Sequence, residues 1–375
     1  MDGESGFSRV TIIGVGLMGG SFGLALKNFY PRVTVTGVDY KRQVEIALDR
    51  GAIDESYPPA HLGRGVEGSD LVVVATPIDG IIRLTTALSG QVDGGAVVLD
   101  LGSTKEEICR TGWEAFSDST AEFVGGHPMT GAEVRGMEGA HPLLYENSVF
   151  VLSTPNGEPT EGSQKLEGFL RRLGTHPHYL SPERHDQLVA RISHLPQLVA
   201  VGLMRNLENS PAGREDDSAE EYLSFAGGGF KDMTRIAGSP FGVWEDILVT
   251  NSGRIKEEIE LFIGVMERLG GLVGEEDMRE DFSRASALRR EVPASNKGIS
   301  SRTVKVAVMV PDRPGSLAEL TSSVAEEGIN VKDLELQKVR EDYGGTFHVY
   351  FESREDATAA CTVMNANGFD SRVID

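Results

Sequence analysis

Glycines near the start of the chain follow a spacing that suits the binding of a dinucleotide. The segment GVGLMG, residues 14–19, matches the pattern GxGxxG and lies between the apolar run VTIIG and a helical pattern. In that context the first glycine permits a tight turn, the second lets the backbone approach a pyrophosphate, and the third lets helix and strand pack closely. The helix N-terminus would face the phosphate charge. We therefore expect the cofactor to be bound by Gly14, Gly16, Leu17, Met18 and Gly19.

A carboxylate further along the chain indicates which dinucleotide binds. Asp39 ends the second apolar run, VTVTGVD, twenty residues after Gly19. A carboxylate there can accept hydrogen bonds from both ribose hydroxyls and would repel a 2′-phosphate, so the pattern favours NAD over NADP. Lys41 and Arg42 follow closely and keep NADP open as an alternative. We assign Thr76, which lies in the run LVVVATP, to the same cofactor site.

Two other polar side chains lie where apolar runs end. Ser103 follows AVVLDLG, and His127 follows a glycine pair in FVGGHP. Ligands bind beyond the carboxyl ends of strands in open α/β sheets, so both residues are candidates for a catalytic site. An imidazole titrates near neutral pH and can accept a hydroxyl proton as a general base. The alternatives are structural: His127 could simply start a helix, and Ser103 could cap the segment TKEEICR, with Glu106 completing a capping box.

Alternating strand and helix patterns must position these residues. Apolar runs predict strands over 10–14, 33–39, 71–77, 96–102, 123–128 and 148–154, and helical spacing follows several of them. Such alternation predicts a parallel sheet with helices on both faces. A closing helix over 164–174 and an edge strand over 175–181 complete this α/β Rossmann-type domain, which we expect to span residues 1–181.

The pattern changes after Pro182. Residues 188–207 and 243–270 have helical spacing, the first interrupted by Pro196, and predict an all-helical domain over 182–295. Residues 296–302 resemble a linker. Residues 303–375 follow the order βαββαβ, which is the ferredoxin-like plan.

Composition excludes several classes of partner. The formal net charge is −21, which disfavours nucleic acid and anionic membranes because both repel an acidic surface. The chain lacks the basic and apolar pattern of a signal peptide and any apolar run of about 18 residues, so the cytoplasm is the expected compartment. The two cysteines form no metal motif, and His176 and His178 have no third ligand nearby, so we expect no metal. The remaining histidines are expected at the surface or in packing: His61, His141, His185 and His348.

Four motifs carry a resemblance to a known family. They are DLGSTK (100–105), GGHPMTGAE (125–133), SHLPQ (193–197) and GGGFKDMTRIA (227–237). In this order and spacing the chain resembles the prephenate dehydrogenase family over almost its whole length. The last unit resembles an ACT domain, a module that binds amino acids, through DRPGSL (312–317) and GIN (328–330). The resemblance implies NAD-dependent oxidative decarboxylation of prephenate to 4-hydroxyphenylpyruvate in tyrosine biosynthesis. The apolar helical domain suggests a homodimer.

The resemblance also implies roles for particular residues. His127 would accept the proton of the substrate hydroxyl. Ser103 would form hydrogen bonds with the substrate hydroxyl and with His127. Arg235 would bind a substrate carboxylate through its planar guanidinium fork, and Asp232 would orient Arg235 or His194. The remaining expected substrate contacts are His194, Glu133 and Gln197. The family often has a histidine where this chain has Gln197, which puts in doubt a proton role at that position and the preference for prephenate over arogenate.

In the ACT-like unit the resemblance implies regulation by tyrosine. Backbone amides at a helix start can meet the carboxylate of an amino acid, and a paired copy would complete the site. The expected ligand residues are Asp312, Gly315, Ser316, Leu317 and Asn330.

Three alternatives stay open. Arogenate dehydrogenase uses the same chemistry on a substrate with an amine in place of the keto group. A β-hydroxyacid dehydrogenase or imine reductase shares a Rossmann domain followed by helices, but GGHPMTGAE and SHLPQ argue against it. A non-catalytic sensor of NAD and amino acids would bind the cofactor without turnover.

Overall fold

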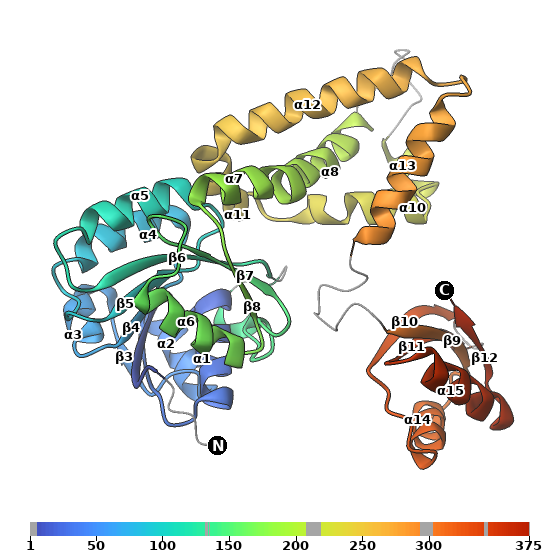
Figure 1. The fold of residues 1–375 in the computed structure, drawn as a ribbon, viewed down its shortest axis with the longest axis horizontal. Coiled ribbons are helices and arrows are strands. Elements are labelled where there is room, and N and C mark those ends of the chain that lie inside the picture. Colours follow the sequence, from blue (N-terminus) through green and yellow to red (C-terminus); the bar gives the residue numbers. More distant parts are fainter. Residues whose placement is uncertain are drawn as a thin grey trace. The chain divides into compact units, whose positions relative to one another are not determined.

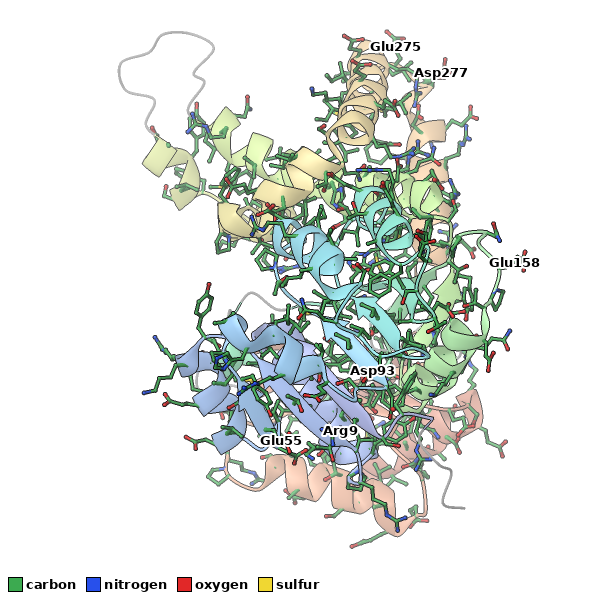
Figure 2. The ribbon with its side chains drawn as sticks, turned by 90° about the vertical axis from the view of Figure 1, so that its left-hand side faces the viewer. Arg9, Glu55, Asp93, Glu158, Glu275 and Asp277 are labelled. Atoms are coloured by element: carbon green, nitrogen blue, oxygen red, sulfur yellow. The ribbon has the colours of Figure 1, made fainter. Side chains whose placement is uncertain are left out.

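The computed structural model describes residues 6–131, 134, 136–207, 219–292, 303–340 and 344–374. The chain divides into two compact units, Met1–Leu288 and Arg289–Asp375, which are described separately below (Figure 1). None of the helices in the described ranges is long and apolar enough to cross a membrane. Acidic side chains such as Glu158, Glu275 and Asp277 project into solvent (Figure 2).

The first unit is built on an eight-stranded sheet. Its strands lie in the order β3-β2-β1-β4-β5-β6-β7-β8. The strands are β1 (Arg9–Ile13), β2 (Thr34–Val38), β3 (Glu55–Tyr57), β4 (Leu71–Val74), β5 (Val97–Asp100), β6 (Glu122–Pro128), β7 (Val149–Ser153) and β8 (His176–Tyr179). Strands β4 and β5 are fully buried, as strands covered by helices on both faces must be.

One expectation about this sheet is wrong. The first six strands are parallel, but β7 runs antiparallel to β6, and β8 is parallel to β7. A parallel neighbour requires a crossover, usually a helix, on one face of the sheet. In the described part of the connection from β6 to β7 the only helical element is the 3-10 turn η2 (Met137–Gly139). Apolar runs reveal that a strand exists, but its direction depends on the connection.

Helices cover both faces of the sheet. They are α1 (Leu17–Phe29), α2 (Lys41–Asp49), α3 (Leu62–Val66), α4 (Ile78–Leu88), α5 (Glu106–Ala115) and α6 (Glu161–Arg172), with the 3-10 turn η1 (Pro59–His61). Phe22 of α1 and Leu166 of α6 belong to the core on one face. Ile81 of α4 and Ile108 of α5 belong to the core on the other, where Ile247 of the helical region joins them.

The helical region of the first unit begins with α7 (Pro182–Val189), η3 (Ala190–His194) and α8 (Leu195–Asn206), which follow one another directly. The predicted interruption at Pro196 takes the form of a π-turn, η3, directly before it. A proline inside a helix lacks an N–H and clashes with the carbonyl four residues earlier, and a wider turn accommodates both. The following elements are α9 (Ala219–Ser224), α10 (Gly228–Thr234), η4 (Arg235–Gly238), α11 (Phe241–Thr250), α12 (Ser252–Gly271) and α13 (Met278–Glu291).

The second unit has the order β9 (Val304–Val310), α14 (Ser316–Glu326), β10 (Asp333–Arg340), β11 (Gly344–Phe351), α15 (Arg354–Ala366) and β12 (Asp370–Ile374). Its strands form an antiparallel sheet in the order β10-β11-β9-β12. Alternate residues of β9, namely Val306, Val308 and Val310, are buried in a core with Leu320 of α14 and Ala360 of α15. The element order is the βαββαβ order that the sequence predicted.

Candidate active site

The glycine loop after β1 has the geometry that its spacing predicted. Gly14 has a φ of 92°, in the left-handed region that favours glycine, and its N–H donates to Val38 O at 2.9 Å. A Cβ at Gly19 would overlap the carbonyl oxygen of Gly14, so helix α1 could not pack this closely on β1. A Cβ at Gly16 would meet no atom within 4 Å. The space beside Gly16 is therefore open to a ligand that approaches the backbone.

Asp39 is tied to this loop. One carboxylate oxygen, Oδ2, accepts the N–H of Val15 at 2.8 Å, and Oδ1 accepts the N–H of Tyr40 at 2.6 Å. The carboxylate is half-buried and is held beside the glycine loop. Thr76 lies between β4 and α4, and a Cβ added at Gly14 would lie 3.0 Å from its Cγ2. The strand order reverses direction between β1 and β4, which is where open α/β sheets bind nucleotides.

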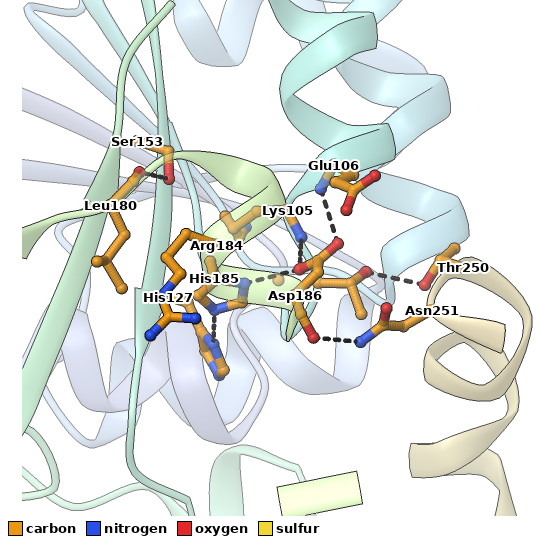
Figure 3. Close-up of polar contacts among 12 residues, drawn as sticks. Lys105, Glu106, His127, Ser153, Leu180, Arg184, His185, Asp186, Thr250 and Asn251 are labelled. Atoms are coloured by element: carbon orange, nitrogen blue, oxygen red, sulfur yellow. Dashed lines mark hydrogen bonds and ion pairs between the residues drawn. The ribbon is translucent and has the colours of Figure 1, made fainter. Parts of the chain in front are cut away.

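His127 lies near the end of β6 and joins a chain of hydrogen bonds to the helical region (Figure 3). Its Nδ1 lies 2.7 Å from Nε2 of His185, and Nδ1 of His185 lies 2.7 Å from Oδ1 of Asp186. His185 and Asp186, both on α7, are 1% exposed. His185 is buried, as a packing residue would be, but its ring also links the candidate base to a buried carboxylate, a role that was not expected.

Asp186 also caps the helix that follows β5. Its Oδ1 accepts the N–H of Lys105 at 2.7 Å, and its Oδ2 accepts the N–H of Glu106 at 2.9 Å. The alternative in which Ser103 and Glu106 form a capping box is wrong, since α5 begins at Glu106 and the N-cap position falls on Lys105. Helix starts need acceptors for their first N–H groups, and here the acceptor comes from a distant helix. Ser103 is half-buried, and its hydroxyl makes no hydrogen bond within the described residues.

A fully buried ion pair supports the ends of β5 and β6. Nζ of Lys105 contacts Oδ2 of Asp100, and neither side chain is exposed. Asp100 also accepts the N–H of Gly126 through Oδ1 at 3.0 Å and the N–H of Gly102 through Oδ2 at 2.8 Å. A Cβ at Gly126 would lie 2.5 Å from the backbone oxygen of Asp100. The glycine before His127 is therefore required by the close approach of the neighbouring strand.

Burial keeps the histidines of this site neutral. It lowers the pKa of His127 well below 6.5, and the nearby His185, Lys105 and His194 act in the same direction. Burial also lowers the pKa of His185, although the hydrogen bond to Asp186 opposes that shift. The pKa of His194 falls to about 4, again mainly through burial. All three rings are uncharged at neutral pH, which is the state that a proton acceptor needs.

His194 and Gln197 are buried within the helical region. Nδ1 of His194 lies 3.2 Å from Nδ2 of Asn251, and the ring packs edge-on against Trp244. Nε2 of Gln197 donates to the carbonyl oxygen of Ile236 at 3.0 Å. Ile236 belongs to η4, the turn that starts with Arg235. Gln197 thus holds the turn that carries the candidate carboxylate-binding arginine.

The other expected substrate residues are less enclosed. Arg235 starts η4 with its side chain exposed, and Asp232 is exposed on α10. Glu133 lies outside the described residues. The roles of these three residues stay predictions. No group of three or more histidine, cysteine, aspartate or glutamate side chains in the described ranges is placed to hold a metal ion.

Sequence reasoning assigned no role to four residues that support His127: Asp100, Lys105, His185 and Asp186. The first two lie within DLGSTK, where a charged pair flanking a buried strand end could have indicated a buried ion pair. The dipeptide His185-Asp186 has no such local signal. It acquires meaning only because α7 docks on the start of α5, 80 residues away in sequence.

A second candidate site lies in the Arg289–Asp375 unit. A cavity of about 340 Å³ is lined by Asp312, Gly315, Ser316 and Leu317 together with Leu336 and Phe347. Gly315 has a φ of 92° and precedes α14. The hydroxyl of Ser316 is buried without a hydrogen-bond partner within the described residues. Asn330, the remaining residue expected here, is exposed before β10 and does not line this cavity.

Comparisons with known proteins place this geometry in a family. The model "Prephenate dehydrogenase, nucleotide-binding domain" matches residues 22–178, and "Prephenate dehydrogenase, dimerization domain" matches residues 181–286. Prephenate dehydrogenase from Bacillus subtilis is 30% identical over 356 residues, which cover 94% of each chain. Cyclohexadienyl dehydrogenase from Zymomonas mobilis is 26% identical over 290 residues, covering 76% of this chain and 95% of the relative.

A solved structure agrees with these matches. Prephenate dehydrogenase from Aquifex aeolicus, in complex with hydroxyphenyl propionate and NAD+, is 29% identical and superposes with a TM-score of 0.68. The match covers 76% of this chain and 98% of that one. The similarity to the Bacillus subtilis enzyme extends over 94% of the chain. It is compatible with the glycine loop, with the histidine at the end of β6 and with the helical region that meets that histidine. The chain therefore belongs to the prephenate dehydrogenase family.

Proposed function

We propose that the chain catalyses the NAD-dependent oxidative decarboxylation of prephenate to 4-hydroxyphenylpyruvate. The observation that carries the proposal is His127, a neutral histidine at the carboxyl edge of the sheet whose Nδ1 is engaged by buried His185. This leaves Nε2 for a substrate hydroxyl. The Aquifex aeolicus relative, whose structure contains NAD+ and a hydroxyphenyl compound, supports the same reading.

The residues beside the glycine loop fit NAD. The open space at Gly16 suits a pyrophosphate, and the carboxylate of Asp39 suits the ribose hydroxyls. When bound, NAD+ would supply the acceptor for the hydride that leaves the carbon carrying the substrate hydroxyl. His127 takes the hydroxyl proton at Nε2, the ring carboxylate leaves as CO2, and the ring becomes aromatic. The phenol oxygen recovers the proton, so the overall reaction releases no proton.

The helical region supplies the groups for the substrate carboxylates. Arg235 is the candidate cation, and its turn is held by the hydrogen bond from Gln197 to Ile236. Ser103 lies beyond β5 with a hydroxyl that makes no hydrogen bond to the described residues, and we assign it to the substrate hydroxyl. Asp232, His194 and Glu133 keep their predicted supporting roles.

One assay tests the proposal. The purified protein with NAD+ and prephenate should form NADH, followed by absorbance, and His127→Ala should lower kcat by roughly 10²–10⁴-fold, the usual contribution of a general base. NAD+ affinity, measured by fluorescence quenching, should not change in that variant. Turnover of arogenate alone would instead establish the rival substrate. NAD+ binding without turnover of either compound would favour the sensor alternative.

We also infer a homodimer formed through the helical region, which we place at residues 182–295. The matched family model describes this region as a dimerization domain. Large apolar side chains are exposed on α12 and α13, including Leu261, Met266, Phe282 and Leu288. Exposed apolar patches of this kind mark protein interfaces. Sedimentation velocity should therefore give twice the mass of one chain.

We infer further that residues 303–375 form an ACT-type regulatory domain, joined through residues 296–302, that binds tyrosine. The βαββαβ order, the cavity at the start of α14 and the buried hydroxyl of Ser316 support the inference. The N–H groups at a helix start suit the carboxylate of an amino acid. The alignment with the Bacillus subtilis enzyme covers 356 residues, more than the 288 residues of the first unit, so that relative has a counterpart to part of this region.

A further inference from the structure

We propose that Asp186 is a positioning residue, which acts through His185 to fix the ring nitrogen of His127 that carries the proton. The proposal rests on the proposed function, because it assumes that His127 is the base. The carboxylate belongs to the helical region, and the base whose tautomer it determines belongs to the sheet (Figure 3).

The hydrogen-bonding capacity of each atom determines where the protons lie. A carboxylate only accepts hydrogen bonds, so Nδ1 of His185 must carry the hydrogen that points to Asp186 Oδ1, 2.7 Å away. Neutral His185 then has a lone pair on Nε2, and Nδ1 of His127 must donate to it across 2.7 Å. Neutral His127 is left with a lone pair on Nε2. One carboxylate thus determines both tautomers and leaves the outer nitrogen of His127 ready to accept a proton.

The orientation of Asp186 is fixed by several independent contacts. Its two oxygens accept the N–H groups of Lys105 and Glu106, both of which need an acceptor at the start of α5. Its backbone carbonyl oxygen accepts from Nδ2 of Asn251 at 2.9 Å, which holds the main chain of α7 in place. Because these donors are backbone groups or buried side chains, the carboxylate cannot rotate without losing hydrogen bonds on both oxygens.

The same contacts couple the base to the docking of the helical region. Thr104 and Thr250 are hydrogen-bonded at 2.8 Å, and Arg254 pairs with Glu106, so three contacts from the helical region meet the start of α5. Of these three, the contact made by Asp186 is the one that also reaches the histidines. If α7 moved away from α5, the first N–H groups of α5 would lose their acceptor. The tautomer of His127 would no longer be determined by Asp186.

The charges around His127 and His185 show why the carboxylate of Asp186 affects their protonation. Lys105 and Asp100 face the pair from β5 and the start of α5 and neutralise each other, and His194 faces it from η3 as an uncharged ring. Asp186 is the negative charge that adjoins His185 directly. It therefore stabilises the imidazolium that forms when His127 accepts the substrate proton.

The substitution Asp186→Asn tests the assignment. An amide cannot accept on both of its polar atoms, and turning its NH2 toward His185 would reverse both tautomers and place a hydrogen on Nε2 of His127. We expect kcat with prephenate and NAD+ to fall by roughly 10²–10⁴-fold, with KM for prephenate and NAD+ affinity within about 3-fold of the unmodified enzyme. The acid limb of the pH profile should move to lower pH, because loss of the negative charge makes the histidine pair harder to protonate.

Arg254→Ala provides the matched control. It removes another contact between the helical region and the start of α5 without touching the histidines, so kcat should stay within about 3-fold of the unmodified value. An equal loss in both variants, or a loss in Asp186→Asn that leaves the pH profile in place, would mean that Asp186 only supports the fold. Near-normal kcat in Asp186→Asn would also overturn the proposal.

A measurement without turnover separates this proposal from the proposed function. In protein labelled with 15N-histidine, NMR should show His127 protonated at Nδ1, and Asp186→Asn should shift it toward protonation at Nε2. Protonation at Nε2 in the unmodified protein would refute the assignment whatever the substrate is. If the tautomers behave as expected but neither prephenate nor arogenate yields NADH, the proposed function fails and the assignment of Asp186 stands.

Discussion

At the scale of single residues, the site depends on a histidine whose environment disfavours charge. His127 reaches the edge of the sheet, yet its ring lies against His185 and near buried Lys105. Both burial and these neighbours oppose protonation, so its pKa lies well below 6.5. A base with a low pKa is a weaker proton acceptor, but it is present in the active form at every physiological pH.

The pH dependence of kcat/KM follows from this shift. The active form is neutral His127, which is lost as the pH falls through a pKa that lies well below 6.5. We expect kcat/KM for prephenate, which reports on the free enzyme, to remain level as the pH decreases to about 6.5 and to decline only below that value. A steady-state profile in constant ionic strength checks this. Half-maximal kcat/KM at pH 6.5 or above would contradict it.

Asp39 should control the choice of cofactor. Loss of a hydrogen bond to a charged group costs about 1.5–3 kcal/mol, so Asp39→Ala should raise KM for NAD+ by roughly 10–150-fold. The same change removes the repulsion of a 2′-phosphate and should narrow the gap between NAD+ and NADP+. Initial rates with both cofactors provide the measurement. A preference of the unmodified enzyme for NADP+ would rule out the assigned role.

Arg235 should act on substrate binding through geometry as well as charge. Arg235→Ala should raise KM for prephenate by roughly 10–150-fold, from the loss of a charge-assisted contact. Arg235→Lys should recover little, because the two parallel N–H groups of the guanidinium are lost. The comparison requires melting temperatures for both variants. An unchanged KM with a lower melting temperature would assign Arg235 to a structural ion pair.

At the scale of elements, the site depends on how closely β6 approaches its neighbours. Gly126 lies so near β5 that an added Cβ would meet the backbone oxygen of Asp100 at 2.5 Å. The π-turn at Ala190–His194 is the corresponding feature of the helical region, since it accommodates Pro196 and carries His194 into the core. The first feature is a close approach within a regular strand, and the second is a local departure from regular helix.

Gly126→Ala should therefore destabilise the fold as well as the site. Overpacking against backbone costs about 1–3 kcal/mol, so we expect the free energy of unfolding to fall by that amount, with a loss of kcat because His127 follows directly. Gly90→Ala is the control, since a Cβ there meets no atom within 4 Å and should change stability by less than about 1 kcal/mol. Urea denaturation of both variants decides. Equal stability of the two would show that β6 can shift away from β5 at no cost.

At the scale of the whole molecule, the chain joins two units that fold around separate cores. The Zymomonas mobilis relative aligns over 290 residues and has almost no chain beyond the match, whereas the Bacillus subtilis relative aligns over 356. The two relatives thus differ in how much of this chain they match. This difference is what a regulatory addition to a complete enzyme would produce.

Removal of the second unit should separate catalysis from regulation. A chain that ends at residue 300 should keep its kcat, while tyrosine, which we expect to inhibit the full chain, should no longer act at saturating prephenate. Coupling between two sites is typically about 1–3 kcal/mol, so the full chain should show a clear shift in inhibition. Kinetics of both chains and calorimetry of residues 303–375 with tyrosine make the test. Identical responses, with no binding to the isolated unit, would mean that the second unit does not sense tyrosine.

The sequence by itself determined the features that depend on neighbours along the chain. The glycine spacing from 14 to 19, the carboxylate at Asp39 and the histidine after a strand are local patterns, and the structure brings Gly14 and Asp39 to the same loop. The periodicity also predicted the helices of residues 188–207 and 243–270 and the βαββαβ order of residues 303–375. Periodicity has this power because burial on one face constrains residues at regular intervals.

Only the tertiary structure decided which distant groups meet. The direction of β7 depends on a connection whose described residues form no crossover helix, and no strand pattern records that. The cap of α5 is Asp186, 80 residues away, and not Ser103, three residues before the helix begins. The same docking of α7 on the start of α5, whose first N–H groups lack acceptors within the helix, also brings His185 to His127. A hydrogen bond between remote segments requires two surfaces to pack first, and that packing is a property of the whole fold.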